Sequence, residues 1–502
     1  MKVIEQYQLF ETVIKNADNA GNVESGVVFE CNEDRRQIAA YKSDENAYTL
    51  RFMPDKTGIW NYRGAVAGQE VRGSFECTQA TGENHGPVRA SGYRFQYADG
   101  AGYMPFGTTC YAWVNQTKEL QEQTLLTLKA SPFNKIRMCI FPKSMPYNNN
   151  DPVDYPFYQD EAGSWDTKKI NFRFWDNLDC RIGELAELGI EADIILFHPY
   201  DRWGFAELST EDSNRYLEYC GARLSAFRNV WWSLANEYEM LYSKSNKDWD
   251  GYGDRLRASD PYGHLMSVHN IFQVYPKRSW MTHCSIQTSE LNNIGLWKKE
   301  YQMPIIIDEC GYEGNIEFGW GNLSAFEMVH RFWWTLSRGG FCTHGETFHR
   351  EDEVLWWAKG GYLYGESVPR IGFLKSLLEE LGEGEVQIPS LADNPNFNGD
   401  DEESIRQRNN FHTLVKSLPE HRQDGVITNI PMIISGENYR LEYLGRSCPG
   451  LIRFELPQDG DYLVEVIDIW EMTRKVAADH VNGQVQIDLP GKEGIAVLAR
   501  RR

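Results

Sequence analysis

Two stretches of the chain share one pattern, in which an apolar run ends on a carboxylate. Val230–Glu237 reads Val-Trp-Trp-Ser-Leu-Ala-Asn-Glu and carries no charge before its last residue. Met303–Cys310 reads Met-Pro-Ile-Ile-Ile-Asp-Glu-Cys, with Glu309 near its end and Gly311 following. Short apolar runs of this kind predict buried strands. Because a carboxylate at the end of a buried strand is costly to desolvate, both glutamates are candidate functional residues.

The middle of the chain alternates strand-like runs with helix-like runs, which is typical of a parallel α/β arrangement. Helical spacing is clearest in Leu178–Leu188, and Leu323–Ser337 and Arg370–Leu381 are further helix candidates. Eight strand–helix units over roughly 280 residues predict a (β/α)8 TIM barrel, with a long polar loop after the second strand at Pro142–Trp175. The eight predicted strands are Tyr103–Cys110, Asn134–Phe141, Glu191–His198, Val230–Glu237, His264–Asn270, Met281–Gln287, Pro304–Glu309 and Gly340–Phe348.

Both ends of the chain show short alternating runs separated by polar turns, such as Tyr48–Met53 near the start and Tyr462–Trp470 near the end. This pattern predicts small β-sandwiches. The fold class is therefore α/β, a TIM barrel flanked by two small β-sandwich domains. The expected divisions are an N-terminal sandwich over 1–90, a catalytic barrel over 91–385, a connector over 386–424 and a C-terminal sandwich over 425–502.

The net charge of the chain limits the classes of molecule that it is expected to bind. The chain of 502 residues has 51 basic and 72 acidic side chains, a net charge of −21. Nucleic acid and anionic membranes need basic patches, so neither is an expected partner. The aromatic fraction of 13% serves cores first, although flat rings also stack on sugars.

The N-terminal residues lack the pattern of a signal peptide, and no apolar run is long enough to span a bilayer. The ten cysteines are scattered without metal-ligand spacing, which favours free thiols in a reducing compartment. We therefore expect a cytoplasmic protein. The sequence leaves the oligomeric state open.

The two strand-end glutamates suit one reaction. In a TIM barrel the catalytic groups stand at the carboxyl ends of strands, and Glu237 and Glu309 end predicted strands four and seven. Two carboxylates flanking a bond are what glycosidic cleavage needs. Glu239 and Asp308 are local rivals; adjacent strand residues point to opposite faces, and Gly311 favours Glu309 over Asp308.

Three motifs carry a resemblance to a known family. Asn236-Glu237, the run Pro304–Gly311, and Phe133–Pro142 with its Arg137 resemble the retaining clan A glycoside hydrolases, close to family 5. The resemblance implies that Glu237 is the acid/base and Glu309 the nucleophile. It also implies that Arg137 hydrogen-bonds the nucleophile and that Asn236 hydrogen-bonds the sugar 2-hydroxyl.

The layout of the whole chain resembles a little-characterised bacterial group of predicted glycosidases with an N-terminal β-sandwich, a barrel and a C-terminal β-sandwich. Glu5–Phe10, Arg51–Trp60 and Phe106–Trp113 carry this likeness. Many clan A members have a Tyr or His on strand six and a Trp on strand eight, where this chain departs from the pattern, so the sugar and its linkage stay open. Further candidate sugar contacts are His198, Trp113, Gln287 and Glu346.

Two alternatives stay open at this stage. One is a non-catalytic carbohydrate-binding protein on a barrel scaffold. The other is metal-assisted hydrolysis, since several histidines lie on predicted strands, although they lack a recognisable ligand spacing. The histidines in question are His198, His269, His283 and His344. The favoured hypothesis requires a carbohydrate substrate, no metal and no organic cofactor.

Overall fold

The computed structural model describes residues 1–15, 21–387, 401–419 and 433–502. By density of contacts the chain divides into two units. Unit 1 is Met1–Gln287 with His349–Leu363, and unit 2 is Thr288–Phe348 with Tyr364–Arg502.

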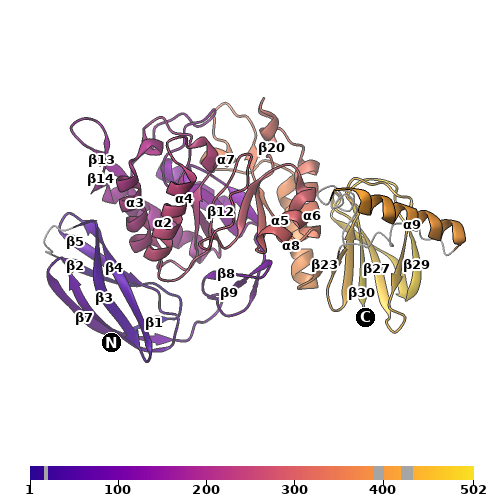
Figure 1. Ribbon diagram of the computed structural model, residues 1–502, viewed down its shortest axis with the longest axis horizontal. Helices are drawn as coiled ribbons and strands as arrows, with labels where there is room; N and C mark the ends of the chain where they lie inside the picture. Colours follow the sequence, from indigo (N-terminus) through magenta and orange to yellow (C-terminus); the bar gives the residue numbers. More distant parts are fainter. Residues whose placement is uncertain (16–20, 388–400, 420–432) are drawn as a thin grey trace. The chain divides into compact units, whose positions relative to one another are not determined.

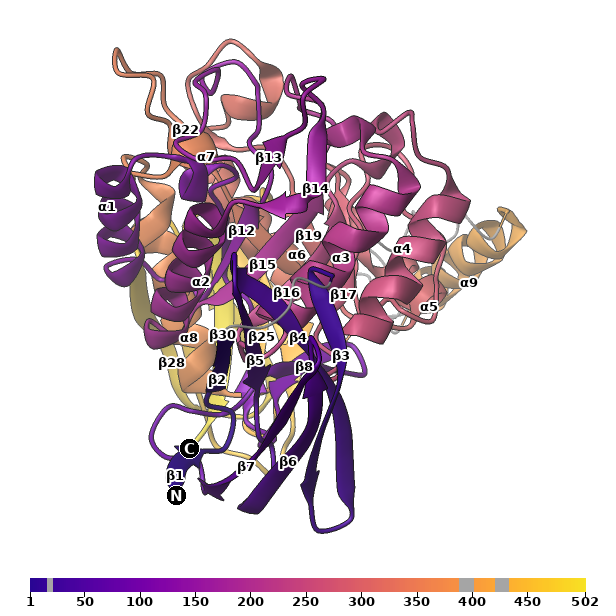
Figure 2. The same cartoon turned by 90° about the vertical axis from the view of Figure 1, so that its left-hand side faces the viewer.

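An eight-stranded sheet forms the TIM barrel, which confirms the predicted fold class. Its strand order is β17-β16-β15-β12-β11-β21-β19-β18, and an isolated parallel bridge between His269 and Ser285 brings its first and last strands together. The barrel is therefore nearly closed, and Figure 2 shows β12, β15 and β16 side by side within it. The strands are β11 (Gly107–Thr109), β12 (Lys135–Cys139), β15 (Glu191–Phe197), β16 (Val230–Ala235), β17 (Met266–Ser267), β18 (Cys284–Gln287), β19 (Ile305–Glu309) and β21 (Phe341–His344).

All eight strands lie where the apolar runs predicted them. The first is shorter than expected, because Gly102–Tyr103 forms β10 and pairs with β9 (Arg94–Tyr97) instead. Pro105 stands between β10 and β11 and has no N–H for a strand ladder. The long loop after β12 carries a hairpin of its own, β13 (Phe157–Gln159) and β14 (Trp165–Ile170).

Helices follow most barrel strands, and the three predicted helices are confirmed as α2, α6 and α8. In α2 the side chains of Leu178, Ile182 and Leu185 are buried at helical spacing, and Gly189 just beyond the helix has a φ of 70° that suits glycine. Figure 1 shows α2, α3 and α4 along one side of the barrel. The helices are α1 (Lys118–Lys129), α2 (Phe172–Glu187), α3 (Thr210–Leu224), α4 (Asn246–Ser259), α5 (Ile294–Tyr301), α6 (Ala325–Ser337), α7 (Trp356–Lys359), α8 (Ser367–Leu381) and α9 (Glu402–Ser417). Within the described residues, none of these helices has both the length and the hydropathy needed to cross a membrane.

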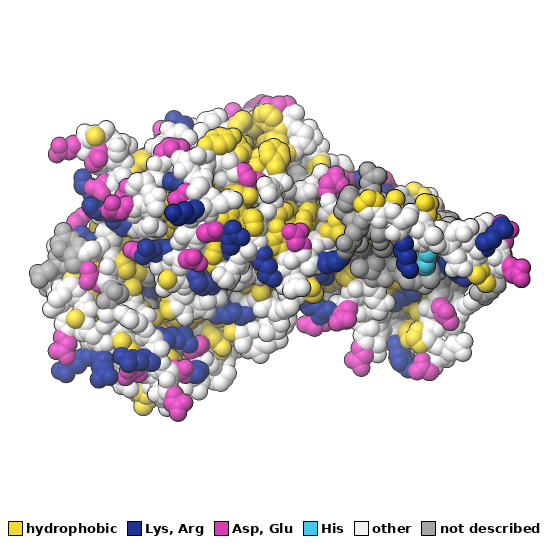
Figure 3. Space-filling view, viewed as in Figure 1, with side chains coloured by type: hydrophobic (Ala, Val, Ile, Leu, Met, Phe, Trp, Pro, Cys, Tyr) yellow, Lys and Arg dark blue, Asp and Glu magenta, His cyan; other side chains and the backbone are white. Residues whose placement is uncertain are grey.

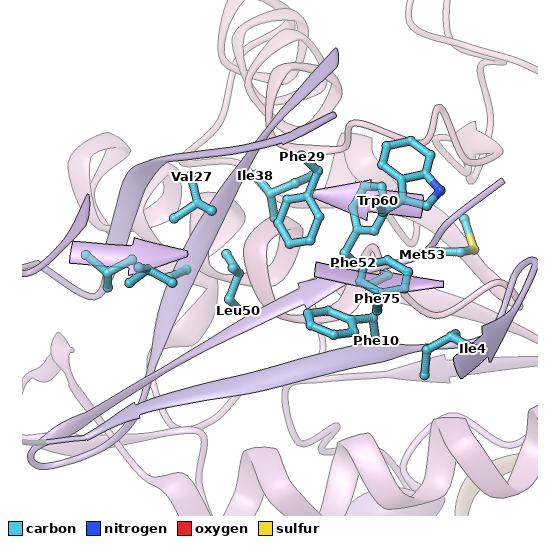
Figure 4. Packing of buried hydrophobic residues seen from close by; sticks show 14 of the residues in the cluster. Ile4, Phe10, Val27, Phe29, Ile38, Leu50, Phe52, Met53, Trp60 and Phe75 are labelled. Atoms are coloured by element: carbon cyan, nitrogen blue, oxygen red, sulfur yellow. The ribbon is translucent and has the colours of Figure 1, made fainter. Parts of the chain in front are cut away.

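The N-terminal β domain is a seven-stranded sheet with the order β1-β7-β6-β3-β4-β5-β2. Its core holds packed aromatic rings, with Phe29 and Phe52 stacked at 4.2 Å between centroids and Trp60 fully buried beside them (Figure 4). The strands are β1 (Lys2–Glu5), β2 (Phe10–Lys15), β3 (Val23–Cys31), β4 (Asp34–Asp44), β5 (Ala47–Phe52), β6 (Gly58–Val66) and β7 (Gln69–Thr78), and β8 (Val88–Ser91) then begins the small sheet with β9 and β10.

The C-terminal β domain consists of antiparallel sheets, with the orders β23-β24-β25-β30-β27-β28 and β26-β29. Part of the predicted connector, and the start of the predicted C-terminal sandwich, lie outside the described residues. The described part of the connector contains helix α9. The strands are β23 (Glu385–Gln387), β24 (Ile433–Ser435), β25 (Tyr439–Tyr443), β26 (Leu451–Leu456), β27 (Tyr462–Asp468), β28 (Thr473–Val481), β29 (Gly483–Asp488) and β30 (Ile495–Arg501).

Within unit 1, a buried ion network joins the N-terminal sheet to the barrel helices. Arg51 of β5 donates to Asp179 of α2 at 2.8 Å, and Arg223 of α3 donates to the same carboxylate oxygen at 2.8 and 3.0 Å. The side chain of Asp179 is 11% exposed, and those of Arg51 and Arg223 are 9% and 1% exposed. Asp179 is thus the buried carboxylate that both guanidinium groups share. Arg51 also pairs with the more exposed Glu11 at 2.8 Å, and Arg223 with the more exposed Asp176 at 2.5 Å.

Replacing Asp179 by Ala should lower the free energy of unfolding by about 3 kcal/mol or more, because it leaves Arg51 and Arg223 undercompensated. The measurement is chemical denaturation followed by tryptophan fluorescence. The matched control, Glu122→Ala, removes one member of an exposed pair with Lys118 on α1 and should change stability by less than about 0.5 kcal/mol. Equal effects of the two substitutions would contradict the role given to Asp179.

Candidate active site

Glu237 occupies a constrained position directly after β16. Its backbone is left-handed, with φ 47° and ψ 57°, a conformation that costs a non-glycine residue about 1 kcal/mol. Hydrogen bonds fix this turn: Tyr238 N donates to His269 O, and Met240 N donates to Glu237 O, both at 3.0 Å. The carboxylate is buried, at 4% exposure, and accepts a hydrogen bond from the Tyr200 hydroxyl. Strained backbone held by its surroundings in this way is concentrated at functional sites.

Asn236 is fully buried beside Glu237. Its Oδ1 accepts hydrogen bonds from Arg137 Nη2 at 3.3 Å and from Tyr111 Oη at 3.4 Å. Because a guanidinium can only donate, this contact fixes which end of the Asn236 amide is the oxygen. Its Nδ2 is buried and has no hydrogen-bond partner among the described residues.

Arg137 lies on β12 and is fully buried in unit 1. Its Nη1 donates to Tyr111 Oη at 3.3 Å, and its Nε lies 3.7 Å from Asp193 Oδ2. Asp193 stands opposite Arg137 in the register of β15 and also pairs with Lys135 at 2.7 Å. A buried arginine needs a carboxylate, and Asp193 is one that the sequence interpretation did not consider. The expected pairing of Arg137 with Glu309 stays a prediction.

Two further residues near Glu237 were missed by the sequence interpretation. Tyr200 follows β15 and donates to Glu237. Lys143 follows β12 and is buried, with its Nζ 3.4 Å from the ring centroid of Tyr111 and 4.4 Å from that of Tyr200. Cation–π contacts of this kind fix both the charge and the rings. In the sequence, these two residues are marked only by their position just beyond a barrel strand. Many loop residues share that position, so it does not single them out.

His198 lies directly after β15, at the carboxyl end of the third barrel strand, and is 3% exposed. Its Nε2 lies 3.1 Å from the carbonyl of Phe141, so Nε2 carries the hydrogen and Nδ1 is the bare acceptor. That Nδ1 is buried and has no hydrogen-bond partner among the described residues. Burial, and then the charge of Lys143, lower the pKa of His198 to about 3. The ring is therefore neutral at physiological pH, and its predicted contact with sugar stays a prediction.

Glu309 is the last residue of β19 in unit 2 and is 9% exposed. Its neighbour Asp308 is fully buried and accepts a hydrogen bond from Thr343 Oγ1 at 2.8 Å. Because successive strand side chains point to opposite faces, this contact directs Asp308 away from the face that Glu309 occupies. Gly311 has a φ of 87°, a conformation that favours glycine. Asp308 therefore has a structural partner, which weakens it as the rival of Glu309.

Glu346 belongs to a buried cluster in unit 2 with Glu313 and His344. Ligand atoms of these three residues lie within 4.8 Å of one another, the one such group found among the described residues. Glu346 accepts from the backbone N–H groups of residues 364 and 365 at 2.6 and 2.8 Å, and Glu313 accepts from those of residues 366 and 367 at 2.8 and 3.2 Å. The carboxylates thus satisfy N–H groups at the start of α8. Burial raises the pKa of Glu346 to about 7.

Trp113 and Gln287 were the remaining candidate sugar contacts. Trp113 is fully buried, and its indole N–H donates to Met138 Sδ at 3.4 Å, so it packs the interior of unit 1. Gln287 ends β18, is half-buried, and exchanges backbone hydrogen bonds with the side chain of Asn270 at 3.2 and 3.4 Å. The sugar contacts of both residues, like that of Glu346, stay predictions.

Comparison with known families now places the chain. A model described as "Apiosidase-like, catalytic domain" matches residues 89–376, and two models of domains of unknown function match 3–67 and 429–500. The chain therefore belongs to the apiosidase-like family. A search of curated proteins finds no match.

Solved structures agree with this family. A crystal structure of a "putative glycoside hydrolase" from Bacteroides vulgatus ATCC 8482 is 31% identical, covers 100% of both chains and has a TM-score of 0.86. A glycoside hydrolase family 5 structure from the same organism is 15% identical, covers 83% of this chain and 93% of its own, and has a TM-score of 0.62. The second likeness concerns the fold alone. The chain thus has the fold and the family of a glycoside hydrolase, as the sequence resemblance predicted.

The buried, neutral His198 should make stability depend on pH. The unfolded chain takes up a proton near the ordinary histidine value of 6.5, whereas the folded ring does so near pKa 3. The unfolded state therefore binds more protons between these values, and His198 makes the wild-type protein lose stability as pH falls, by up to about 1.4 kcal/mol per pH unit.

Replacing His198 by Asn should flatten this dependence between pH 6 and pH 4. The measurement is the free energy of unfolding of both proteins by urea denaturation at several pH values. Parallel curves for the two proteins would show that His198 is not buried in its neutral form.

Proposed function

We propose that the protein is a retaining O-glycoside hydrolase in which Glu309 is the nucleophile and Glu237 is the acid/base. The observation that carries the proposal is the constrained state of Glu237, a buried carboxylate on a left-handed strand end with a hydroxyl donor and an adjacent oriented amide. The family and the fold supply the reaction class. Glu309 ends a strand of the same parallel barrel, and catalytic groups in such barrels stand at the carboxyl ends of strands.

The proposed mechanism is a double displacement on a carbohydrate substrate. Glu309 attacks the anomeric carbon while Glu237 protonates the leaving oxygen, which gives a covalent glycosyl–enzyme intermediate. Glu237, now a carboxylate, removes a proton from water, and the hydroxide released on that face displaces Glu309 with net retention of configuration. The hydroxyl of Tyr200 holds the Glu237 carboxylate in place through both steps.

Asn236 and Arg137 have supporting roles in this proposal. The buried Nδ2 of Asn236 would donate to the sugar 2-hydroxyl, a contact that strengthens in the transition state. Arg137, oriented by Asp193 and Tyr111, would stabilise the ionised nucleophile. The ten cysteines, all within the described residues, form no disulfides with one another, which suits the reducing cytoplasm that we propose as the site of action.

The surface agrees with a neutral substrate. Figure 3 shows Lys and Arg side chains interspersed with Asp and Glu across the face it presents, on a chain of net charge −21. A carbohydrate needs no charged counterpart, whereas nucleic acid requires a concentrated basic surface.

Replacing the two carboxylates should separate their roles. Glu237→Ala should lower kcat about a hundredfold to ten-thousandfold on glycosides with poor leaving groups, because general acid catalysis is lost. The loss should be smaller on dinitrophenyl glycosides, whose leaving group needs no proton. Added azide should then restore turnover, yielding a glycosyl azide of retained configuration from Glu237→Ala and of inverted configuration from Glu309→Ala.

The control for both variants is Glu122→Gln, an exposed change on α1 that should leave turnover unchanged. NMR of the first product anomer gives the stereochemical course directly. Inversion of configuration by the wild-type enzyme, or wild-type turnover by Glu309→Gln, would falsify the nucleophile assignment. A crystal structure should place the two carboxyl groups about 5–5.5 Å apart if the enzyme retains configuration.

Tyr200→Phe should reduce kcat/KM by about tenfold to a hundredfold, because a hydrogen bond to a charged group is worth about 1.5–3 kcal/mol. The effect should appear in kcat rather than in KM, since the hydroxyl donates to the proposed acid/base Glu237. The matched control is Tyr158→Phe, which removes a hydroxyl that donates to Asn171 at 3.3 Å. If the two variants lose activity equally, Tyr200 does not act through Glu237.

A further inference from the structure

Phe272 is the most exposed large hydrophobic residue of the described chain, at 89%. It follows β17 in unit 1, so it lies in the loop at the carboxyl end of barrel strand five. The neighbouring strand in the sheet is β16, which precedes Glu237. Tyr242, on the loop after strand four, is 88% exposed. A single exposed ring is common on protein surfaces, so exposure alone assigns no role.

The backbone that carries Phe272 is fixed by the residues just after Glu237. The carboxylate of Glu239 accepts hydrogen bonds from three consecutive N–H groups, those of residues 271, 272 and 273, at 2.7, 3.1 and 2.7 Å. The hydroxyl of Tyr238 donates to the carbonyl of Gln273 at 3.1 Å. Charge-assisted bonds to backbone N–H groups are among the stronger hydrogen bonds of proteins. The exposed ring is therefore presented on a rigid loop.

Because the loop is already rigid, less conformational entropy is lost when a ligand binds to the Phe272 ring. This favours a binding role for the ring over exposure without a function. The same segment, 237–239, carries the proposed acid/base and the anchor of the Phe272 loop. This segment therefore fixes the position of Phe272 relative to the proposed acid/base.

We propose that Phe272 is the stacking platform of a sugar subsite next to the cleavage point, which takes the C–H face of a further sugar ring of an oligosaccharide. Glu239 is the positioning residue of this subsite. The inference rests on the proposed function and extends it to substrates of at least two sugar units. The phenyl ring has no hydrogen-bonding group, so it contacts the apolar face of the sugar ring. The subsite therefore contributes affinity rather than recognition of sugar hydroxyl groups.

The test compares two substrates that carry the same sugar at the cleaved bond. One is whichever member of a panel of di- and trisaccharides the enzyme cleaves. The other is the glycosyl fluoride of that sugar, whose leaving group is too small to reach a second subsite. Phe272→Ala should lower kcat/KM on the oligosaccharide at least about tenfold more than it lowers kcat/KM on the fluoride. A tenfold difference corresponds to a free energy of about 1.4 kcal/mol. Phe272→Trp should retain the oligosaccharide activity. The matched control is Tyr93→Ala, a 42% exposed ring between β8 and β9 that should show no such difference.

Glu239→Gln should reproduce the selective loss, and the double variant with Phe272→Ala should lose little more, because both changes remove one platform. A merely structural role for Glu239 would lower activity on both substrates alike. Equal losses on oligosaccharide and fluoride in Phe272→Ala would overturn the inference while leaving the hydrolase proposal intact.

Calorimetric binding of the same oligosaccharide panel to Glu237→Gln, with and without Phe272→Ala, separates the two proposals. If the wild-type protein cleaves nothing but binding weakens tenfold without the ring, the hydrolase proposal fails, whereas the stacking of Phe272 on a bound sugar is supported. If the panel binds equally with and without the ring, the subsite is refuted whatever the turnover.

Discussion

The barrel interior of unit 1 is organised by the cost of burying charge. Lys135 and Arg137 point from β12, and Asp193 points from the neighbouring β15, all essentially without exposure. A charge so far from water must be paired, and ion pairs of Asp193 with Lys135 and with Arg137 join the three side chains. Arg137 in turn orients Asn236 and the hydroxyl of Tyr111. The ion pairs that stability requires thereby also orient the polar groups beside Glu237.

The same logic explains why the site is built on strand ends and on the short loops just after them. Glu237 is held in a left-handed conformation by hydrogen bonds to its neighbours, and Lys143 is held between aromatic rings. Each contact removes freedom from a side chain or a loop before any ligand arrives. Pre-organised groups need no rearrangement during a reaction, and this is where much of the power of an active site originates.

Sequence reasoning worked where a pattern is local. The apolar runs gave all eight barrel strands, because a strand buried on both faces must be nearly continuous in hydrophobic residues. Helical spacing gave α2, α6 and α8, and the strand-end positions singled out Glu237 and Glu309. Individual aromatic residues carry no such local signal, because a tryptophan in a core and one in a cleft have the same local sequence. Trp113 is fully buried against Met138, and its predicted contact with sugar stays a prediction.

The amino-acid sequence by itself determined the barrel, its flanking β domains and the carboxylates that end two of its strands, because these follow from periodicity along the chain. Only the tertiary structure decided the partners: Asp193 for Arg137, Tyr200 for Glu237, Thr343 for Asp308, and Glu239 for the loop of Phe272. Such pairs join residues that are tens of positions apart. Their choice depends on strand register and on loop path, which are set by how the whole barrel closes.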